Sequence, residues 1–282
     1  EAVGFVSVPM HAPIAGTVTA VDYALNPRGE MAQAIKIKID PDADQEEIYG
    51  TPRDLASLTP DELIRAVQET GTVGLGGAAF PTHVKMKPPA GKSVDTLIVN
   101  GCECEPYLTT DFRIMVEESD KIITGIQLVM EAMGAKEAFI AIENNKPEAL
   151  ESMAKAIPAG APISVRSLMT KYPQGAEKML SRAVLHKDVP SGGLPSDIGV
   201  GCFTVPTLLQ LGQLLPKGQG LIERVITVSG GGVERPGNYR IPLGTPIRYI
   251  MEQVGIRPEA RKIISGGPMM GMSLSSQDIP LT

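Results

Sequence analysis

The sequence predicts a multidomain α/β protein, because the hydrophobic pattern changes twice along its 282 residues. From Thr96 to about residue 216, apolar strands alternate with segments of helical periodicity, and both ends of the chain show short β segments with Gly and Pro turns. Strands that alternate with helices indicate a mostly parallel sheet. Ligands of such sheets bind beyond the carboxyl ends of the strands, so a functional site is expected there.

The first third of the chain predicts a small β segment, a linker and a helix. The runs VPMHAPIAGTVTAV (residues 8–21) and AIKIKID (34–40) alternate around a turn, as in a β-hairpin. The acidic stretch Asp40–Asp54 is typical of a linker. Thr59-Pro60-Asp61-Glu62 is a capping box with Pro at the first helical position, so a helix is expected to begin there.

The middle of the chain predicts three strands with helices between them, and the last third predicts a separate small α+β module. The expected strands are TLIVN (96–100), EAFIAIE (137–143) and ISVRSLM (163–169), with helices at 113–133, from 147 to about 157, and from about 174. The uncharged stretch 198–216 contains Pro206, Gln210 and Gln213, which favours buried core over a membrane span. One helix is expected to open after Thr245-Pro246.

Composition excludes several classes of protein. A chain that is 43% hydrophobic and 21% charged is typical of a globular protein, and its net charge of −6 without a basic run argues against a nucleic-acid partner. Three cysteines cannot build a disulfide framework, and Cys102 and Cys104 are spaced too closely for a standard zinc or cluster site. No secretory signal is visible, so a cytoplasmic location is expected.

Three segments could carry chemistry. In GLGGAAFPTHVK (74–85), glycine amides could converge on an anion beside Lys85, with Phe80 as a ring face, although glycine spacing alone favours a structural turn. NGCECEPYLTTD (100–111) follows a strand and could present Asn100, Glu103 and Glu105 to ribose hydroxyls or a flavin ring, or could be a solvated acidic loop. KYPQGAEK (171–178) follows another strand. No catalytic side chain and no metal site are predicted, and the three dispersed histidines are assigned no role.

Taken together and in this order, these segments resemble one family. GFVSVPMHAPIAGTV, GLGGAAFPTHVK, NGCECEPYLTTDFRIM, IENNKPEAL, TKYPQGAEK, SDIGV, RPGNYRIPLGTPIRY and SGGPMMG look like the RnfC family, the C subunit of the Rnf electron-transport complex. GGAAFPT and ECEP are more distantly similar to the NADH-oxidising flavoprotein subunit of respiratory complex I. The resemblance implies a partial barrel-sandwich hybrid at 1–50, a Rossmann-like FMN and NADH domain at 51–220, a β-grasp domain of the SLBB type at 221–274, and a linker at 275–282.

The resemblance also implies the residues of a flavin site. The flavin phosphate would be cradled by the glycine-rich loop and the ring or ribityl chain by the acidic segment. The NADH side would be bounded by residues of the acidic segment and of KYPQGAEK. The implied residues are Gly74, Gly76, Gly77 and Lys85 for the phosphate, Asn100 and Glu103 for the ring, Phe80 for stacking, and Glu105, Tyr172 and Glu177 for NADH. Thr204 stands near the flavin where the family has Asn, and Ala79 and Cys102 also depart from the related patterns.

The implied activity is an NADH-linked oxidoreductase subunit that exchanges hydride with FMN and single electrons with iron–sulfur clusters. The [4Fe–4S] clusters are expected in the full-length protein, outside this chain. Expected partners are the other subunits of a membrane-bound complex, NADH and, indirectly, ferredoxin, with the protein docked on the inner face of the cell membrane. Two alternatives stay open: a cobalamin-reductase-type flavoprotein of microcompartments, and a non-catalytic docking subunit with a degenerate flavin site.

Overall fold

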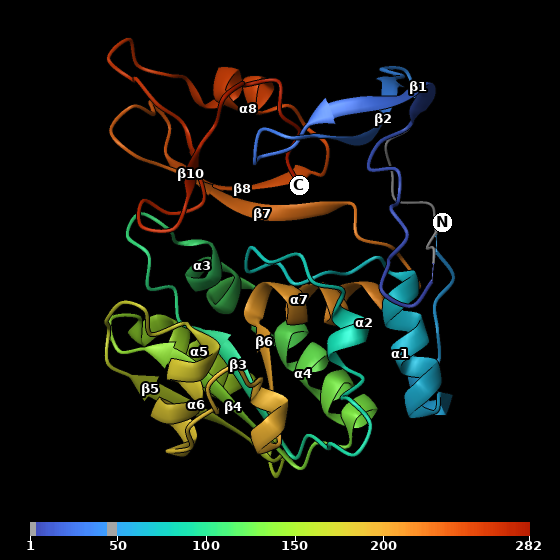
Figure 1. Ribbon diagram of the computed structural model, residues 1–282, viewed down its shortest axis with the longest axis vertical. Coiled ribbons are helices and arrows are strands. Elements are labelled where there is room, and N and C mark those ends of the chain that lie inside the picture. The colour runs from blue at the N-terminus through green and yellow to red at the C-terminus, as the bar shows by residue number, and fades with distance from the viewer. Residues whose placement is uncertain (1–3, 44–49) are drawn as a thin grey trace. The chain divides into compact units, whose positions relative to one another are not determined.

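The computed structural model describes residues 4–43 and 50–282, which fall into two compact units. One unit, the nucleotide unit, comprises residues 4–10, 50–104 and 111–221, and the other, the C-terminal unit, comprises residues 11–43, 105–110 and 222–282. Figure 1 labels their elements. Of the predicted linker at 40–54, residues 44–49 lie outside the described residues.

The nucleotide unit is built on a parallel four-stranded sheet. Its strands are β3 (Thr96–Gly101), β4 (Glu137–Glu143), β5 (Ile163–Leu168) and β6 (Val200–Thr204). Their order is β5-β4-β3-β6, and every neighbouring pair is parallel. The chain therefore moves outward from β3 to β5 and then returns to the opposite side of β3, which confirms the predicted parallel α/β layer.

Helices cover both faces of this sheet. Helix α4 (Ser119–Met133) packs against α7 (Val205–Leu214), α1 (Pro60–Glu69) and α5 (Pro147–Ala156), whereas α6 (Glu177–Leu185) packs against β3 and β4. The α4–α7 crossing is close because both helices contribute glycine: a Cβ on Gly125 would lie 2.0 Å from the Leu208 carbonyl oxygen. On the α6 side, the core includes Ile98, Ala141, Leu180 and Cys202.

The sequence placed most elements correctly, missed two boundaries and predicted neither β6 nor α7, which lie in the stretch expected only as buried core. The predicted capping box is present, since Glu62 donates its backbone amide to the Thr59 side chain and accepts from the Thr59 amide. The predicted helix at 113–133 is two helices, α3 (Thr110–Glu117) and α4, because Glu118 leaves the helical conformation at ψ 27°. Helix α6 begins at Glu177, later than predicted, because 171–174 and 173–176 close two turns through backbone hydrogen bonds first. The described part of the nucleotide unit also contains the short helices α2 (Thr82–Lys85), η1 (Leu55–Ser57) and η2 (Pro195–Ile198).

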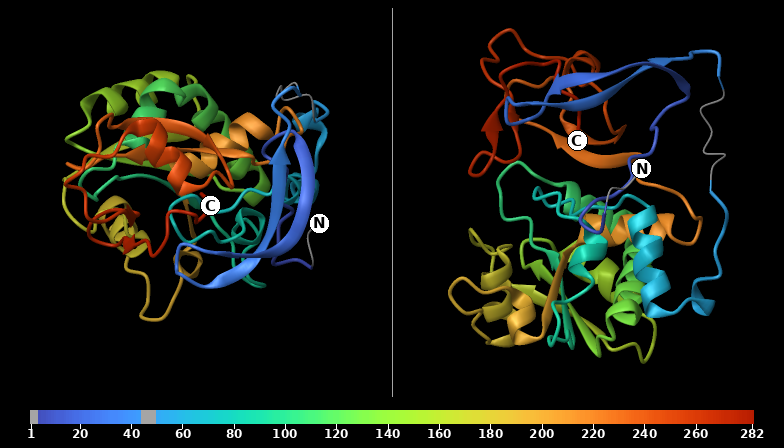
Figure 2. Two further views of the ribbon diagram at one scale, coloured as in Figure 1. Left: turned by 90° about the horizontal axis from the view of Figure 1, so that it is seen from above. Right: turned by 45° about the vertical axis from the view of Figure 1, so that its right-hand side comes forward.

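The C-terminal unit contains the predicted N-terminal hairpin and the C-terminal α+β module. Strands β1 (Gly16–Leu25) and β2 (Met31–Ile39) form a long, twisted antiparallel ribbon, visible in both views of Figure 2. The module contains β7 (Glu223–Val228), β8 (Gly237–Pro242), α8 (Ile247–Val254), β9 (Ile264–Ser265) and β10 (Met272–Ser273). Its core centres on Val228, Ile250 and Val254.

Candidate functional site

The candidate site lies where the strand order of the sheet reverses. Strand β3 pairs with β4 on one side and with β6 on the other, and Asn100 near the end of β3 is in register with Thr204 at the end of β6. The connection after β3 leads to β4 on one side, whereas β6, the last strand of this sheet along the chain, lies on the other side of β3. Ligands of parallel sheets bind beyond the carboxyl ends of the strands at such a point, and we name this position the crevice. A nucleotide site is therefore favoured beside Asn100 and Thr204.

The glycine-rich loop is a closed turn. The Gly74 amide donates to the Phe80 carbonyl over 2.8 Å, and the Ala79 amide donates to the Gly74 carbonyl over 3.2 Å. Gly77 has φ +111°, which favours glycine, and a Cβ there would meet no atom within 4 Å. The loop thus presents open backbone around Gly77, as an anion-binding loop requires.

This loop packs against the end of β6. A Cβ on Gly76 would lie 2.9 Å from Cγ2 of Thr204, so only glycine allows the loop to approach so closely. The buried Leu75 amide donates to Oγ1 of Thr207 over 3.0 Å, and that hydroxyl also bonds with Oγ1 of Thr204 at 2.9 Å. The two threonines therefore anchor the glycine-rich loop at the crevice.

The loop after β5 packs against the other side of the same crevice. Asn100 donates its side-chain amide to the Gly175 carbonyl over 2.9 Å, and its Oδ1 accepts from the Cys102 amide over 3.1 Å. A Cβ on Gly175 would lie 2.9 Å from the Cys102 carbonyl oxygen, so this approach also requires glycine. Asn100 therefore ties the end of β3 to the segment that leads into α6.

An ion pair joins the glycine-rich segment to this α6 segment. Lys85 Nζ lies 2.5 Å from Oε1 of Glu177, and 5.5 Å from the centre of the Phe203 ring. Burial raises the pKa of the neighbouring Cys202 thiol to about 12; the charge of Glu177 also raises it, and that of Lys85 lowers it. Cys202 is therefore a protonated core residue beneath the pair.

Glu103 has a structural partner in the same unit. Its carboxylate accepts from the Asp111 and Phe112 amides at 2.9 and 3.3 Å, at the start of α3. Burial raises the pKa of this carboxyl, while the two amides lower it. A carboxylate at a helix N-terminus is stabilised by the free amides there, so Glu103 holds the base of the loop after β3.

The structure brings most of the predicted site residues together in the nucleotide unit. Contacts or strand register link Gly76, Thr204, Asn100, Glu177 and Lys85 into one group through the loops described above. Phe80 and Tyr172 are in the adjoining loops with exposed side chains. Glu105 belongs to the C-terminal unit, where its carboxylate binds backbone amides.

Sequence reasoning missed three residues. Phe203 and Thr207 lie on either side of Thr204, in the uncharged stretch that was predicted only as buried core, and the apolar run 200–205 was the available signal. Glu143 ends β4, is 1% exposed, and neither of its carboxylate oxygens forms a hydrogen bond of normal geometry. Burial raises its pKa, opposed by the charge of Lys146 and the nearby Lys171 amide. An acidic residue closing an apolar strand was the signal for Glu143.

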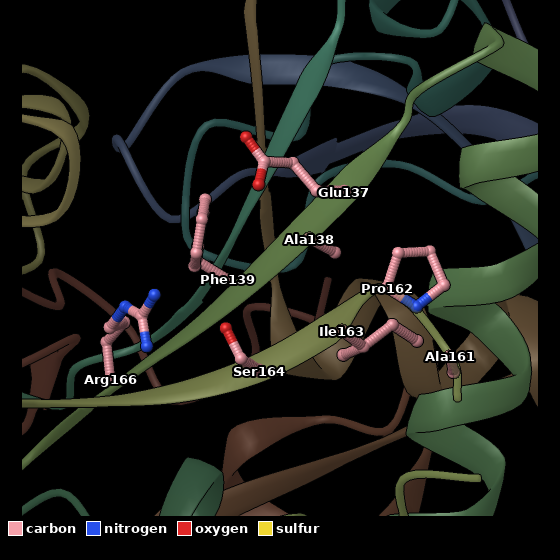
Figure 3. Close-up of a pocket in the computed structure, with 8 residues that line it drawn as sticks. All are labelled: Glu137, Ala138, Phe139, Ala161, Pro162, Ile163, Ser164 and Arg166. Atoms are coloured by element: carbon pink, nitrogen blue, oxygen red, sulfur yellow. The ribbon is translucent and has the colours of Figure 1, made fainter. Parts of the chain in front are cut away.

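A pocket of about 340 Å³ lies away from this site, along β4 and β5 near the amino ends of these strands (Figure 3). Its wall includes Phe139 and Arg166, whose guanidinium carbon lies 4.7 Å from the ring centre. Within residues 4–43 and 50–282, no group of three or more His, Cys, Asp or Glu side chains is arranged to hold a metal ion. In the same part of the chain, no helix combines the length and apolar character that a bilayer crossing requires.

The residues at the crevice fit a flavin mononucleotide. The glycine-rich segment contains both open backbone around Gly77 and the Lys85 ammonium, and a phosphate prefers backbone amides and a cation of this kind. Asn100 supplies an amide at the edge of the sheet, and Phe80 supplies an exposed ring. These groups together suit a ligand that carries a phosphate group and a planar heterocycle.

Comparison with known families agrees with this fold. The Nuo51 FMN-binding domain matches residues 67–213, just over half of the chain, and the SLBB domain matches residues 225–273. The chain belongs to the Nuo51 FMN-binding domain family. It combines a Rossmann-like flavoprotein domain with a β-grasp domain of the SLBB type, as predicted.

Curated relatives narrow the relationship to the C subunits of ion-translocating complexes. The chain is 43% identical to that of the proton-translocating ferredoxin:NAD(+) oxidoreductase complex of Clostridium ljungdahlii and 41% identical to that of the Na(+)-translocating ferredoxin:NAD(+) oxidoreductase complex of Acetobacterium woodii. It is 36% identical to that of the ion-translocating oxidoreductase complex of Serratia proteamaculans. These matches cover 98%, 99% and 98% of this chain, but only 61%, 63% and 39% of the relatives. The predicted resemblance to the RnfC family is confirmed, and the microcompartment and docking alternatives are not favoured.

Solved structures support the fold alone. An NAD+-reducing [NiFe]-hydrogenase in its H2-reduced state aligns with a TM-score of 0.59 at 21% identity, covering 81% of this chain and 47% of the hydrogenase chain. The air-oxidized state aligns with a TM-score of 0.60 at 19% identity, covering 82% and 47%.

Proposed function

We propose that this chain is the flavin-binding part of an electron-transfer subunit of an ion-translocating ferredoxin:NAD oxidoreductase complex. The observation that carries the proposal is the meeting of the glycine-rich loop, Asn100, Thr204 and the Lys85–Glu177 pair at one crevice. The names of the relatives, which share 36 to 43% of their aligned residues with this chain, support the class of complex.

Within this site, each group of residues has a proposed role. The amides of the glycine-rich loop and the ammonium of Lys85 bind the FMN phosphate, and the end of β3 holds the ring or ribityl chain. Exposed aromatic and acidic side chains bound the NADH side. The residues are Gly74, Gly76, Gly77 and Lys85 for phosphate, Asn100, Glu103 and Thr204 for the flavin, Phe80 for stacking on the nucleotide, and Tyr172 and Glu177 for NADH. Glu105 is left out of this set because its carboxylate binds backbone amides of the C-terminal unit.

FMN, when bound, supplies the ability to accept a hydride from NADH and to release single electrons. The chain's own residues bind and orient the flavin and exclude water from the crevice. The proposal places residues 51–220 in the nucleotide domain, 1–50 in a partial barrel-sandwich hybrid and 221–274 in the SLBB domain. [4Fe–4S] clusters, ferredoxin and the other subunits belong to the longer protein and its complex at the inner membrane face.

Titration of the purified chain with FMN, followed by anaerobic addition of NADH, tests this proposal. The expected result is quenching of flavin fluorescence on binding and bleaching of the flavin absorbance when NADH is added. A folded sample that leaves FMN fluorescence unchanged would contradict the flavin site. Binding without bleaching would contradict the NADH role and leave the flavin site standing.

A further inference from the structure

The segment between β3 and α3 is an excursion of the chain into the C-terminal unit. Residues 105–110 belong to that unit, although Cys104 before them and Asp111 after them belong to the nucleotide unit. Side chains of the C-terminal module bind the excursion directly. Thr227 accepts from the Thr109 amide at 3.1 Å, Asn238 donates to Thr109 Oγ1 at 3.0 Å, and Ser229 donates to the Tyr107 carbonyl at 2.9 Å.

Glu105, the first residue of the excursion, has the most specific of these contacts. Its two carboxylate oxygens accept from consecutive backbone amides, Oε2 from Met269 and Oε1 from Met270, each over 2.8 Å. Hydrogen bonds from backbone amides to an ionised carboxylate are about twice as strong as neutral ones. The carboxylate therefore fills a backbone nest in the loop 266–271, named here the Met loop.

The glycines of the Met loop fit this carboxylate. A Cβ on Gly267 would lie 2.1 Å from Oε2 of Glu105, and a Cβ on Gly271 would lie 2.4 Å from the Gly267 carbonyl oxygen. Gly266 has φ +92°, a conformation that favours glycine. The loop is thus shaped around Glu105, whereas a solvated acidic loop would need none of these glycines.

We propose that Glu105 is a positioning residue that anchors the excursion to the Met loop and thereby holds the flavin-binding end of β3 in its conformation. The covalent path is short, because Glu105 follows Cys104 and Glu103 directly. Glu103 accepts from the Asp111 and Phe112 amides, which directly follow the excursion. The residues on either side of the excursion are therefore held together. Through this covalent path the anchor fixes the geometry of Glu103 and Asn100, an inference that rests on the proposed flavin site.

Amide hydrogen exchange of the whole chain tests the anchor independently of flavin. In Glu105→Ala, exchange at Met269 and Met270 should accelerate at least about tenfold, because both amides lose a charged acceptor. Glu105→Gln retains one side-chain oxygen and should show an intermediate rate. Glu259→Gln, an exposed glutamate of the same module, is the matched control and should leave the rates unchanged.

Gly267→Ala is a second substitution that should break the contact between Glu105 and the Met loop. Its Cβ would collide with the Glu105 carboxylate, so it should accelerate exchange at Met269 and Met270 in the parent chain. In the Glu105→Ala background the same change should add little, since most of the colliding side chain is absent. Independent, additive effects of the two substitutions would contradict the anchor.

The functional arm measures FMN affinity by fluorescence. Glu105→Ala should weaken FMN binding about fivefold to tenfold, with Glu105→Gln between it and the parent chain, and with an unchanged unfolding midpoint of the nucleotide unit. Unchanged FMN affinity together with faster exchange would overturn the claim that the anchor holds the end of β3 in its flavin-binding conformation. Unchanged exchange at Met269 and Met270 in Glu105→Ala would overturn the anchor. A parent chain that fails to bind FMN would overturn the proposed function, and the exchange rates alone would then decide whether the anchor exists.

Discussion

Asn100 and Thr204 are register partners on adjacent parallel strands, at the point where the order of the sheet reverses. Each residue holds one of the loops beside the crevice. Asn100 bonds to the Gly175 carbonyl, and Thr204 bonds to Thr207, which accepts from the Leu75 amide. The pair therefore organises loops from three separate parts of the chain around one position.

Asn100→Ala should weaken FMN binding by at least about tenfold and destabilise the chain by about 1–3 kcal/mol, since the Gly175 carbonyl and the Cys102 amide lose their partner. Asn144→Ala is the control. Asn144 follows β4 and accepts from the Thr170 amide and hydroxyl, so its loss should lower stability but leave FMN affinity unchanged. Fluorescence titration measures the FMN affinity and urea unfolding measures the stability. Equal FMN affinities in the two variants would argue against flavin binding at the crevice.

Lys85→Gln should weaken FMN binding by at least about tenfold with little change in stability. The Lys85–Glu177 pair is partly exposed, and pairs of that kind contribute about 1 kcal/mol or less. The matched variant Lys155→Gln removes an exposed pair with Glu151 on α5 and should leave FMN affinity unchanged. Inorganic phosphate should compete with FMN in the parent chain. It should no longer lower the apparent FMN affinity of Lys85→Gln if the ammonium binds the phosphate group.

Glu143→Gln should stabilise the chain more at about pH 8 than at about pH 5. Burial raises the folded-state pKa of Glu143 above the ordinary value of 4.5, so the carboxylate costs stability as the pH rises from that value through the folded pKa. Glu151→Gln should do the opposite and lose a little stability at higher pH, because Lys155 lowers the pKa of Glu151. Urea unfolding at both pH values measures the two signs, and a uniform effect of Glu143→Gln would contradict the unpartnered carboxylate.

Cys104 should react with iodoacetamide before the other two cysteines. Cys102 and Cys202 are buried, and burial raises the pKa of both thiols, so neither presents a thiolate near neutral pH. Cys104 is only partly buried. Mass spectrometry of the labelled native chain should find one modified thiol, and early labelling of Cys202 would contradict a closed core beneath the Lys85–Glu177 pair.

The sequence predicted three of the four strands of the parallel sheet and the segments of the proposed site because these depend on local patterns. Strand TLIVN, the Thr59 capping box and the glycine-rich loop are each encoded within a few neighbouring residues. The break at Glu118 carries no Gly or Pro signal, and the anchoring of Leu75 by Thr207 joins residues that are 132 positions apart. The binding of Glu105 to the Met loop spans 164 positions. Such contacts follow from the assembled fold and not from any local pattern.

Amide hydrogen exchange with and without FMN tests the central claim, that the flavin occupies the crevice between the ends of β3 and β6. We expect FMN to slow exchange in residues 74–85, 100–103 and 172–177, with no change in residues 137–139 and 161–166 along the pocket of Figure 3. Protection confined to that pocket, with none at the crevice, would contradict the claim.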